Sequence, residues 1–181
     1  MSNEKFYTVD IAGVKRDLPV CRLNENLSIA GFVIFGDVEI TVHAAKELLA
    51  RVPEFDYILT PEAKSIPLAY EMSRQSGKKY FVARKKEKIY MTDPVRVSVQ
   101  SITTKGEQTL ILDGKDGEEL RGKRIIIVDD VISTGESLKA VEKLAEAFEC
   151  RVVAKTAVLA EGDAFNRKDL TVLGFLPLIE N

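Results

Sequence analysis

Residues 122–141, GKRIIIVDDVISTGESLKAV, constrain the fold of this 181-residue chain more than any other segment. They include four branched apolar residues at 125–128, a run typical of a parallel strand that is buried on both faces. Two adjacent acids, Asp129 and Asp130, end that run, and a short loop and a helical apolar pattern follow. In an open α/β sheet, ligands bind beyond the carboxyl ends of the strands. The segment therefore predicts a binding site at this strand end.

The loop that follows the acids is suited to an anion. It consists of Ser133, Thr134, Gly135, Glu136 and Ser137. Because these residues lie where a helix should begin, their N–H groups have no intrahelical partner and can point at a ligand. Glycine allows a positive φ and a close backbone approach, and the three hydroxyls add donors. The loop therefore fits a phosphate monoester, although serine and threonine at such a position can also serve only as a helix N-cap.

Asp129 and Asp130 cannot bind the same phosphate, because like charges repel. They suit sugar hydroxyls or a hard cation such as Mg²⁺, so a sugar phosphate with vicinal hydroxyls would satisfy the acids and the loop together. Two alternatives stay open. Acids at a strand end can simply be solvated, and a receiver-type domain also places an acid pair near Mg²⁺. In a receiver-type domain the acids and the hydroxyl come from separate strands, whereas here they fall in one unbroken segment.

The order Ile-Ile-Ile-Val-Asp-Asp-Val-Ile-Ser-Thr-Gly-Glu-Ser resembles, at every position, the phosphoribosyl-pyrophosphate (PRPP) signature of type I phosphoribosyltransferases. The resemblance implies an α/β fold with a mainly parallel central sheet flanked by helices. It also implies transfer of 5-phosphoribosyl from PRPP to a nitrogenous base, with release of pyrophosphate. Asp129 and Asp130 would be catalytic residues that hold the ribose hydroxyls and, indirectly through PRPP, Mg²⁺. Residues 133–137 would anchor the 5′-phosphate, and the protein would be a homodimer.

Two further segments resemble the pyrophosphate-binding loops of adenine phosphoribosyltransferases. Residues 61–65 (PEAKS) resemble their Glu-Ala-Arg-Gly-Phe loop, which tends to hold a cis peptide; the lysine keeps the positive charge of the arginine but loses its bidentate fork. Residues 84–88 (RKKEK) resemble their Arg-Lys-x-Gly-Lys segment, with a glutamate in place of the glycine. Taken alone, the first would be an ordinary helix cap and the second a solvated charge run. The resemblance assigns pyrophosphate binding to Lys64, Ser65, Arg84, Lys85 and Lys88.

Residues 31–38 resemble, more loosely, the Gly-x-x-Phe-x-Asp pattern that lines the base pocket of the same enzymes, with Gly36 where an arginine is usual. The candidate base-binding residues are Ile34, Phe35 and Val131. Residues 89–108 correspond to the lid that closes over PRPP and excludes water. The adenine enzymes carry Leu-Glu-Tyr-Gly there. A rough placement puts residues 104–106 (TKG) at that point, so the glutamate is absent unless Glu107 replaces it.

We therefore expect a purine base as the acceptor, and the three adenine-type segments favour adenine. Xanthine, hypoxanthine, guanine and orotate are alternatives, and a non-catalytic PRPP-sensing regulator is the alternative from another class. Such regulators usually carry a DNA-binding module or a basic face. This chain has no room for a helix-turn-helix and a formal net charge of −2, so we do not expect nucleic-acid binding.

The composition, 45% hydrophobic and 30% charged, is ordinary for a soluble globular protein. The length suits one domain over residues 1–181, with residues 1–28 as a hood or an edge hairpin. Two cysteines are too few for a disulfide scaffold or a zinc cluster, and His43, the only histidine, is expected on a helix surface. No segment resembles a signal peptide or is long enough to span a membrane, so we expect a cytoplasmic protein.

Strand and helix patterns alternate through most of the chain, which independently predicts an α/β fold with a mainly parallel sheet. Residues 5–23 predict a hairpin that either caps the site or covers the sheet edge, and Pro19 predicts that its second strand is an edge strand or ends early. Asp37 is expected to cap a helix. Residues 113–117 are expected to form a turn before a short helical connection. The predicted strands cover residues 29–35, 55–60, 79–83, 109–112, 125–128 and 152–159. Residues 95–99 are predicted to form a strand or a flexible hairpin, and residues 171–178 one strand or two.

Overall fold

The computed structural model describes residues 5–100 and 107–181 of the chain. In chain order the elements are β1 (Phe6–Ile11), β2 (Val14–Arg22), β3 (Leu27–Ala30), α1 (Val38–Leu49), β4 (Tyr57–Pro61), α2 (Ile66–Ser76), β5 (Tyr80–Ala83), β6 (Val95–Gln100), β7 (Glu107–Leu112), α3 (Gly114–Leu120), β8 (Arg124–Ile132), α4 (Glu136–Ala147), β9 (Arg151–Glu161), the 3-10 helix η1 (Gly162–Asn166), β10 (Leu170–Leu176) and β11 (Leu178–Glu180). The predicted turn at residues 113–117 is wrong, because the Asp113 carboxylate accepts a hydrogen bond from the Lys115 N–H and starts α3 at Gly114.

A five-stranded sheet with the order β10-β9-β8-β4-β5 forms the centre of the molecule, and each neighbouring pair in it is parallel. The prediction of a mainly parallel central sheet is confirmed. The apolar run at residues 125–128 lies in β8 and is at most 1% exposed, because the strand is covered on both faces.

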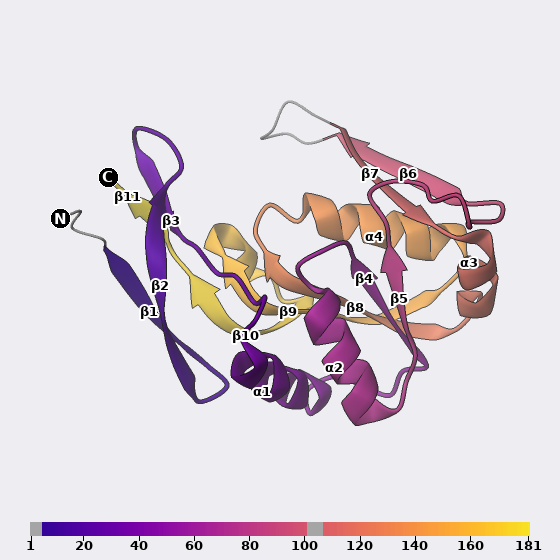
Figure 1. Ribbon diagram of the computed structural model, residues 1–181, viewed down its shortest axis with the longest axis horizontal. Coiled ribbons are helices and arrows are strands. Elements are labelled where there is room, and N and C mark those ends of the chain that lie inside the picture. Colours follow the sequence, from indigo (N-terminus) through magenta and orange to yellow (C-terminus); the bar gives the residue numbers. More distant parts are fainter. Residues whose placement is uncertain (1–4, 101–106) are drawn as a thin grey trace.

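Helices from the first part of the chain cover one face of this sheet, and later elements cover the other. Figure 1 shows α1 and α2 on one face and α4, α3 and the β6–β7 hairpin on the other. The side chains of β8 alternate between these layers: Ile126 and Val128 pack into the cluster with α1 and α2, whereas Ile125 and Ile127 pack with α4 and α3. β8 is therefore fixed from both sides, and so is the position of the acid pair near its carboxyl end.

The N-terminal hairpin is confirmed as β1 and β2, and it is part of a four-stranded antiparallel sheet with the order β1-β2-β3-β11. The inference that Pro19 marks an edge strand or an early end is wrong, because β2 continues to Arg22. Proline is tolerated there because β2 pairs with β1 up to Pro19 and with β3 only from Val20. β1 also lies against β10, the edge strand of the central sheet, so the hairpin covers that edge.

The strand predicted at residues 29–35 is confirmed only to Ala30, where β3 ends. The Gly31 N–H donates to the Pro19 carbonyl at 2.8 Å, and the chain then leaves the sheet. Apolar residues still alternate along this segment: Phe32 and Ile34 are buried, while Val33 and Phe35 are more than half exposed. The apolar run therefore reflects packing against the core and not strand pairing.

The structure also bears on the predictions for the start of α1, for residues 95–99 and for the lid. Asp37 caps α1 as predicted, accepting from the Ile40 N–H at 3.1 Å, and His43 is exposed on that helix. Val95, Val97 and Val99 pack toward the α4 side, which confirms a strand at residues 95–99. The predicted lid position at residues 104–106 lies outside the described residues. Within the described ranges, no helix has both the length and the apolar character needed to cross a bilayer.

Candidate active site

The acid pair lies near the carboxyl end of β8 and is nearly inaccessible. Asp129 is 8% exposed and Asp130 4%, and the Asp130 N–H donates to Asp129 Oδ1 at 2.9 Å. Burial, and secondly the charge of Asp130, raise the pKa of the Asp129 carboxyl well above its ordinary value. The acids are therefore not simply solvated carboxylates at a strand end.

Lys64 faces this pair. Lys64 Nζ lies 2.9 Å from Asp130 Oδ2, and that oxygen has no hydrogen-bond partner among the described residues. Lys64 comes from the loop between β4 and α2, next to β8 in the sheet. The lysine therefore neutralises part of the acid pair in this arrangement, while half of its own side chain stays accessible at 49% exposure.

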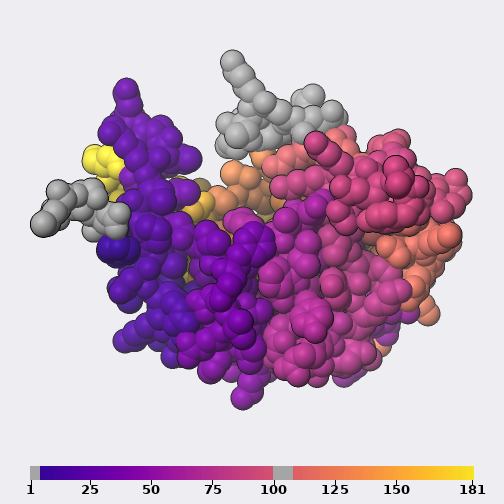
Figure 2. All heavy atoms as spheres, viewed as in Figure 1, coloured from indigo at the N-terminus to yellow at the C-terminus, as the bar shows by residue number. Residues whose placement is uncertain are grey.

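A cavity of about 610 Å³, which we call the acid-pair cavity, lies at this edge of the sheet. The residues that line it include Lys64, Lys85, Gln108, Asp129, Asp130, Val131 and Ser137. Figure 2 shows the molecule hollowed beside the rising N-terminal sheet, with orange atoms of the β8–α4 part of the chain visible in the hollow. The carboxyl ends of β4, β5 and β8 thus contribute residues to one space, as expected for neighbouring parallel strands.

The loop of residues 133–137, which we call the anion loop, borders an adjoining space of about 140 Å³ that Asp129 also lines. α4 begins at Glu136, and its N-cap is Gly135, with φ 78° and no side-chain capping hydrogen bond. The alternative that Ser133 or Thr134 serves only as a helix cap is therefore wrong. No N-cap side chain accepts from the first N–H groups of α4, and the helix dipole favours negative charge there.

The loop between β4 and α2 is held by buried hydroxyls. The Thr60 hydroxyl lies 2.8 Å from both the Val128 carbonyl oxygen and the Ser65 hydroxyl, and Ser65 in turn donates to the Pro61 carbonyl at 2.8 Å. Ser65 is 1% exposed, so its side chain supports the loop from behind. The Glu62–Ala63 peptide bond is cis.

Glu62 connects this loop to the basic segment after β5. Its Oε2 accepts from the Lys85 N–H at 2.9 Å and from Arg84 Nε at 3.2 Å, and these contacts hold the pKa of Glu62 below its usual range, with the charge of Lys88 as a further cause. Arg84 also donates to the Tyr90 hydroxyl at 3.2 Å. The Glu62 side chain is a site feature that the sequence alone did not indicate.

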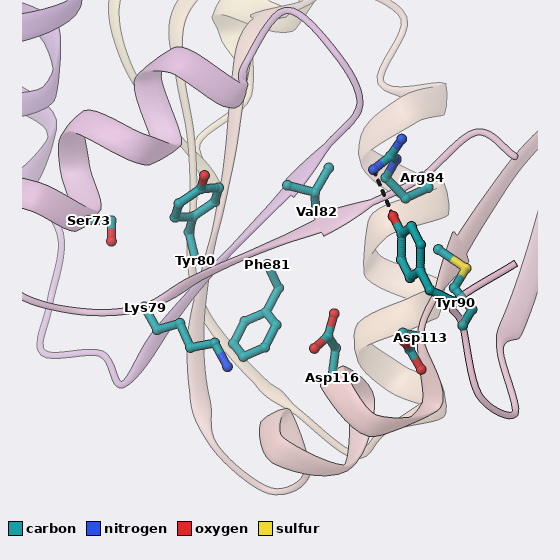
Figure 3. A pocket seen from close by; sticks show the side chains of 10 residues that line it. Ser73, Lys79, Tyr80, Phe81, Val82, Arg84, Tyr90, Asp113 and Asp116 are labelled. Carbon is teal, nitrogen blue, oxygen red and sulfur yellow. Dashed lines mark hydrogen bonds between the residues drawn. The ribbon is translucent and has the colours of Figure 1, made fainter. Parts of the chain in front are cut away.

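Arg84 and Lys85 face different spaces. Lys85 lines the acid-pair cavity, whereas Arg84 lines a second cavity of about 460 Å³ at the outer edge of β5. Figure 3 shows that cavity, with the Arg84–Tyr90 hydrogen bond on one side and Asp113 and Asp116 from the start of α3 below it. Of the predicted pyrophosphate residues, Lys64 and Lys85 are therefore the two that line the acid-pair cavity in this arrangement.

The predicted base-binding residues are separated. Val131 lines the acid-pair cavity, but Ile34 is 0% exposed and packs in the apolar core with α1 and α2, and Phe35 is 53% exposed. Phe35 lies in a turn that the hydrogen bond from the Asp37 N–H to the Ile34 carbonyl closes at 3.1 Å, so its side chain stays outside while that of Ile34 is buried. A role for Ile34 as a direct contact to the base is inconsistent with its burial in this structure.

The phosphoribosyl transferase domain model matches residues 39–172, which include the acid pair, the anion loop and both basic loops. The chain belongs to this family. Its relatives include a hypoxanthine/guanine phosphoribosyltransferase of Methanosarcina mazei, 32% identical over 80% of this chain and 74% of the relative. An adenine phosphoribosyltransferase of Cenarchaeum symbiosum is 34% identical over 71% of this chain and 79% of the relative.

Other matches are shorter: a hypoxanthine/guanine phosphoribosyltransferase of Methanococcus voltae is 36% identical, but the match spans 64% of this chain and only 59% of that protein. Among solved structures, the adenine phosphoribosyltransferase of Thermoanaerobacter pseudethanolicus superposes with a TM-score of 0.66 over 94% of this chain and 95% of the other, at 18% identity. The family's fold is thus present over nearly the whole chain.

The acid pair could supply some of the oxygen ligands of a hard cation. Asp130 Oδ2 has no hydrogen-bond partner among the described residues, and carboxylate oxygens are preferred ligands of Mg²⁺. The described residues contain no group of three or more His, Cys, Asp or Glu side chains that could hold a metal ion. The two carboxylates can therefore contribute only part of a magnesium site, and a bound substrate would have to supply the remaining oxygens.

Proposed function

We propose that this protein transfers the 5-phosphoribosyl group of PRPP to a purine base and releases pyrophosphate. The main observation behind the proposal is that acidic and basic side chains lie together at the carboxyl end of β8. The buried acids line the same cavity as Lys64 and Lys85, and the anion loop begins a few residues further along the chain. PRPP carries vicinal ribose hydroxyls, a 5′-phosphate and a diphosphate, and these three groups match the acids, the loop and the lysines.

Each set of residues then binds a different part of PRPP. Asp129 and Asp130 hold the ribose hydroxyls, and in their ionised form they stabilise the positive charge that develops on the ribose as the diphosphate leaves. Residues 133–137 anchor the 5′-phosphate, so that binding energy far from the reacting carbon orients it. Lys64 and Lys85 neutralise the departing diphosphate, with Arg84, Lys88 and the backbone at Ser65 as further candidates. Mg²⁺, held by Asp129 and Asp130 through PRPP, would offset the diphosphate charge.

We propose a purine as the acceptor because the printed names of the relatives are adenine and hypoxanthine/guanine phosphoribosyltransferases. Adenine is our first candidate, with hypoxanthine and guanine next. The test is a panel of adenine, hypoxanthine, guanine, xanthine, orotate and uracil, each with PRPP and Mg²⁺, assayed for pyrophosphate release. Release with one purine supports the proposal. PRPP binding without release for any base would instead indicate a PRPP-sensing regulator.

Replacement of Glu62 by Gln tests the pyrophosphate side of the site. Because the Glu62 carboxylate holds both the Lys85 N–H and the Arg84 guanidinium, we expect the KM for PRPP to rise about tenfold, the scale of weakening one charged hydrogen bond, with a smaller change in kcat. Glu118→Gln is the matched control, since Glu118 pairs in a similar way with Arg121 on α3, away from this cavity. Equal KM values for Glu62→Gln and the control would remove Glu62 from the site.

The homodimer that the resemblance implies also stays a proposal. Sedimentation at micromolar concentration measures it directly, and a fully active monomer would contradict it.

A further inference from the structure

Arg167, which the sequence did not indicate as a site residue, lies against the anion loop. It follows η1, in the connection between β9 and β10. β9 is the parallel neighbour of β8, so the carboxyl ends of both strands meet at the same edge of the sheet. A residue about 30 positions further along the chain is thereby brought beside the start of α4.

The contact is close. A Cβ built on Gly135 would lie 2.9 Å from Arg167 Nη1, nearer than real side chains approach. A Cβ is about 2.5 Å from its own backbone nitrogen, so Nη1 lies within about 5.5 Å of the Gly135 nitrogen. Hydrogen bonds of about 2.9 Å let one phosphate group bridge two donors at that spacing.

The guanidinium is anchored on one side only. Nε and Nη2 donate to the two carboxylate oxygens of Asp169, at 3.0 and 2.7 Å, and Lys155 also pairs with Asp169, at 3.1 Å. Nη1 has no hydrogen-bond partner among the described residues, although the side chain is only 32% exposed. The bidentate pair thus fixes the orientation of the arginine and leaves two N–H groups beside the anion loop.

Charge supports the same assignment. The anion loop contains Glu136, and Asp129 borders the same space, so a phosphate dianion there would meet two acidic residues. Backbone N–H groups and a helix dipole supply only partial positive charge. Arg167 adds a charged donor at the point where a phosphate approaches, although it shares its charge with Asp169.

We propose that Arg167 is a further binding residue for the 5′-phosphate, closing the anion loop on the Gly135 side. The inference rests on the proposed function, since it takes the loop to bind the phosphate of PRPP. It assigns to Arg167 a selective effect: it should strengthen binding of ligands that carry a 5′-phosphate and leave binding of free pyrophosphate unchanged.

The test compares wild-type protein with Arg167→Gln in calorimetric titrations with ribose 5-phosphate, PRPP and magnesium pyrophosphate. We expect affinity for ribose 5-phosphate and PRPP to fall about tenfold or more, the scale of a charged hydrogen bond, and affinity for magnesium pyrophosphate to stay within about twofold. Arg167→Lys should give an intermediate loss, because it keeps the charge but not the fork that pairs with Asp169. Arg121→Gln, which removes a similar bidentate arginine just after α3, is the control and should change none of the three.

Two outcomes overturn the inference in different ways. If wild-type protein binds ribose 5-phosphate and folded Arg167→Gln binds it equally well, Arg167 has only a structural role, even if the variant melts at a lower temperature. If both affinities, for ribose 5-phosphate and for magnesium pyrophosphate, fall together, Arg167 supports the whole site and not the phosphate. If the wild-type protein binds no 5′-phosphate ligand at all, the proposed function fails and the inference fails with it.

Discussion

Replacing both acids in the variant Asp129→Asn/Asp130→Asn should lower turnover at least about a hundredfold, the scale of losing preorganised electrostatic stabilisation of a developing charge. Both side chains are nearly inaccessible and line the acid-pair cavity with Lys64. Asparagine keeps their size and an oxygen acceptor for the Asp130 N–H, so the change removes the ability to ionise and little packing. The measurement is kcat at saturating PRPP with the base that the panel identifies.

The single variant Asp129→Asn separates function from folding. Burial raises the pKa of this carboxyl, so between the unfolded value near 4 and the raised folded value the native state binds more protons than the unfolded state. The contribution of Asp129 to stability is therefore fully present below the unfolded pKa and is lost as the pH rises through the folded pKa. A neutral asparagine avoids that loss. We expect the variant to melt a few degrees higher than wild type at pH 8, and about equally at pH 4.

Lower turnover in the double variant together with a higher melting temperature of Asp129→Asn at pH 8 would show that the acids serve activity and lower the stability of the fold. A double variant that is folded and nearly as active as wild type would remove these carboxylates from the mechanism. A single variant that loses activity and also melts far lower at pH 8 would indicate a structural role instead, since the buried charge would then be stabilising.

The parts of the site that could be predicted from sequence are those that lie in one continuous segment. The buried run of β8, the acid pair and the anion loop follow one another directly, so local periodicity and helix-start chemistry were enough to place them. The fold class followed from the alternation of strand and helix patterns and from the resemblance. The central sheet, the family match and the structural neighbours confirm both.

What could not be predicted depends on side-chain direction and on tertiary neighbours. Ile34 was expected at the base, but its side chain is buried in the core just before a turn at Phe35 and Gly36. Arg84 and Lys85 are adjacent in sequence, yet Arg84 lines the cavity at the edge of β5 and Lys85 lines the acid-pair cavity. Arg167 reaches Gly135 only because β9 lies beside β8, and no local pattern indicates that pairing.

Gly135→Val should abolish the stabilisation of the protein by PRPP while leaving the fold largely intact. Gly135 has φ 78°, which a β-branched residue disfavours, and a Cβ there would lie 2.9 Å from Arg167 Nη1. The valine would therefore disturb the anion loop from the backbone and from the arginine side together. A ligand present at a hundred times its Kd adds about 2.7 kcal/mol to stability. Wild-type protein should accordingly melt about 5–10 °C higher with PRPP and Mg²⁺. Ribose 5-phosphate should give a smaller shift, because it lacks the diphosphate.

The control for this variant is Gly122→Val. Gly122 has a similar φ of 70°, no atom within 4 Å of the added Cβ, and a position in the turn before β8, at the opposite end of that strand from the anion loop. Both variants should lose stability without ligand from a similar backbone strain, and Gly135→Val should lose somewhat more because its Cβ also approaches Arg167. Only Gly122→Val should keep the full PRPP shift. A full shift in both variants would show that the geometry of Gly135 is irrelevant to PRPP, and the anion loop would then have no part in binding. Loss of the shift in both would trace the effect to general destabilisation, because Gly122 has no contact with the site.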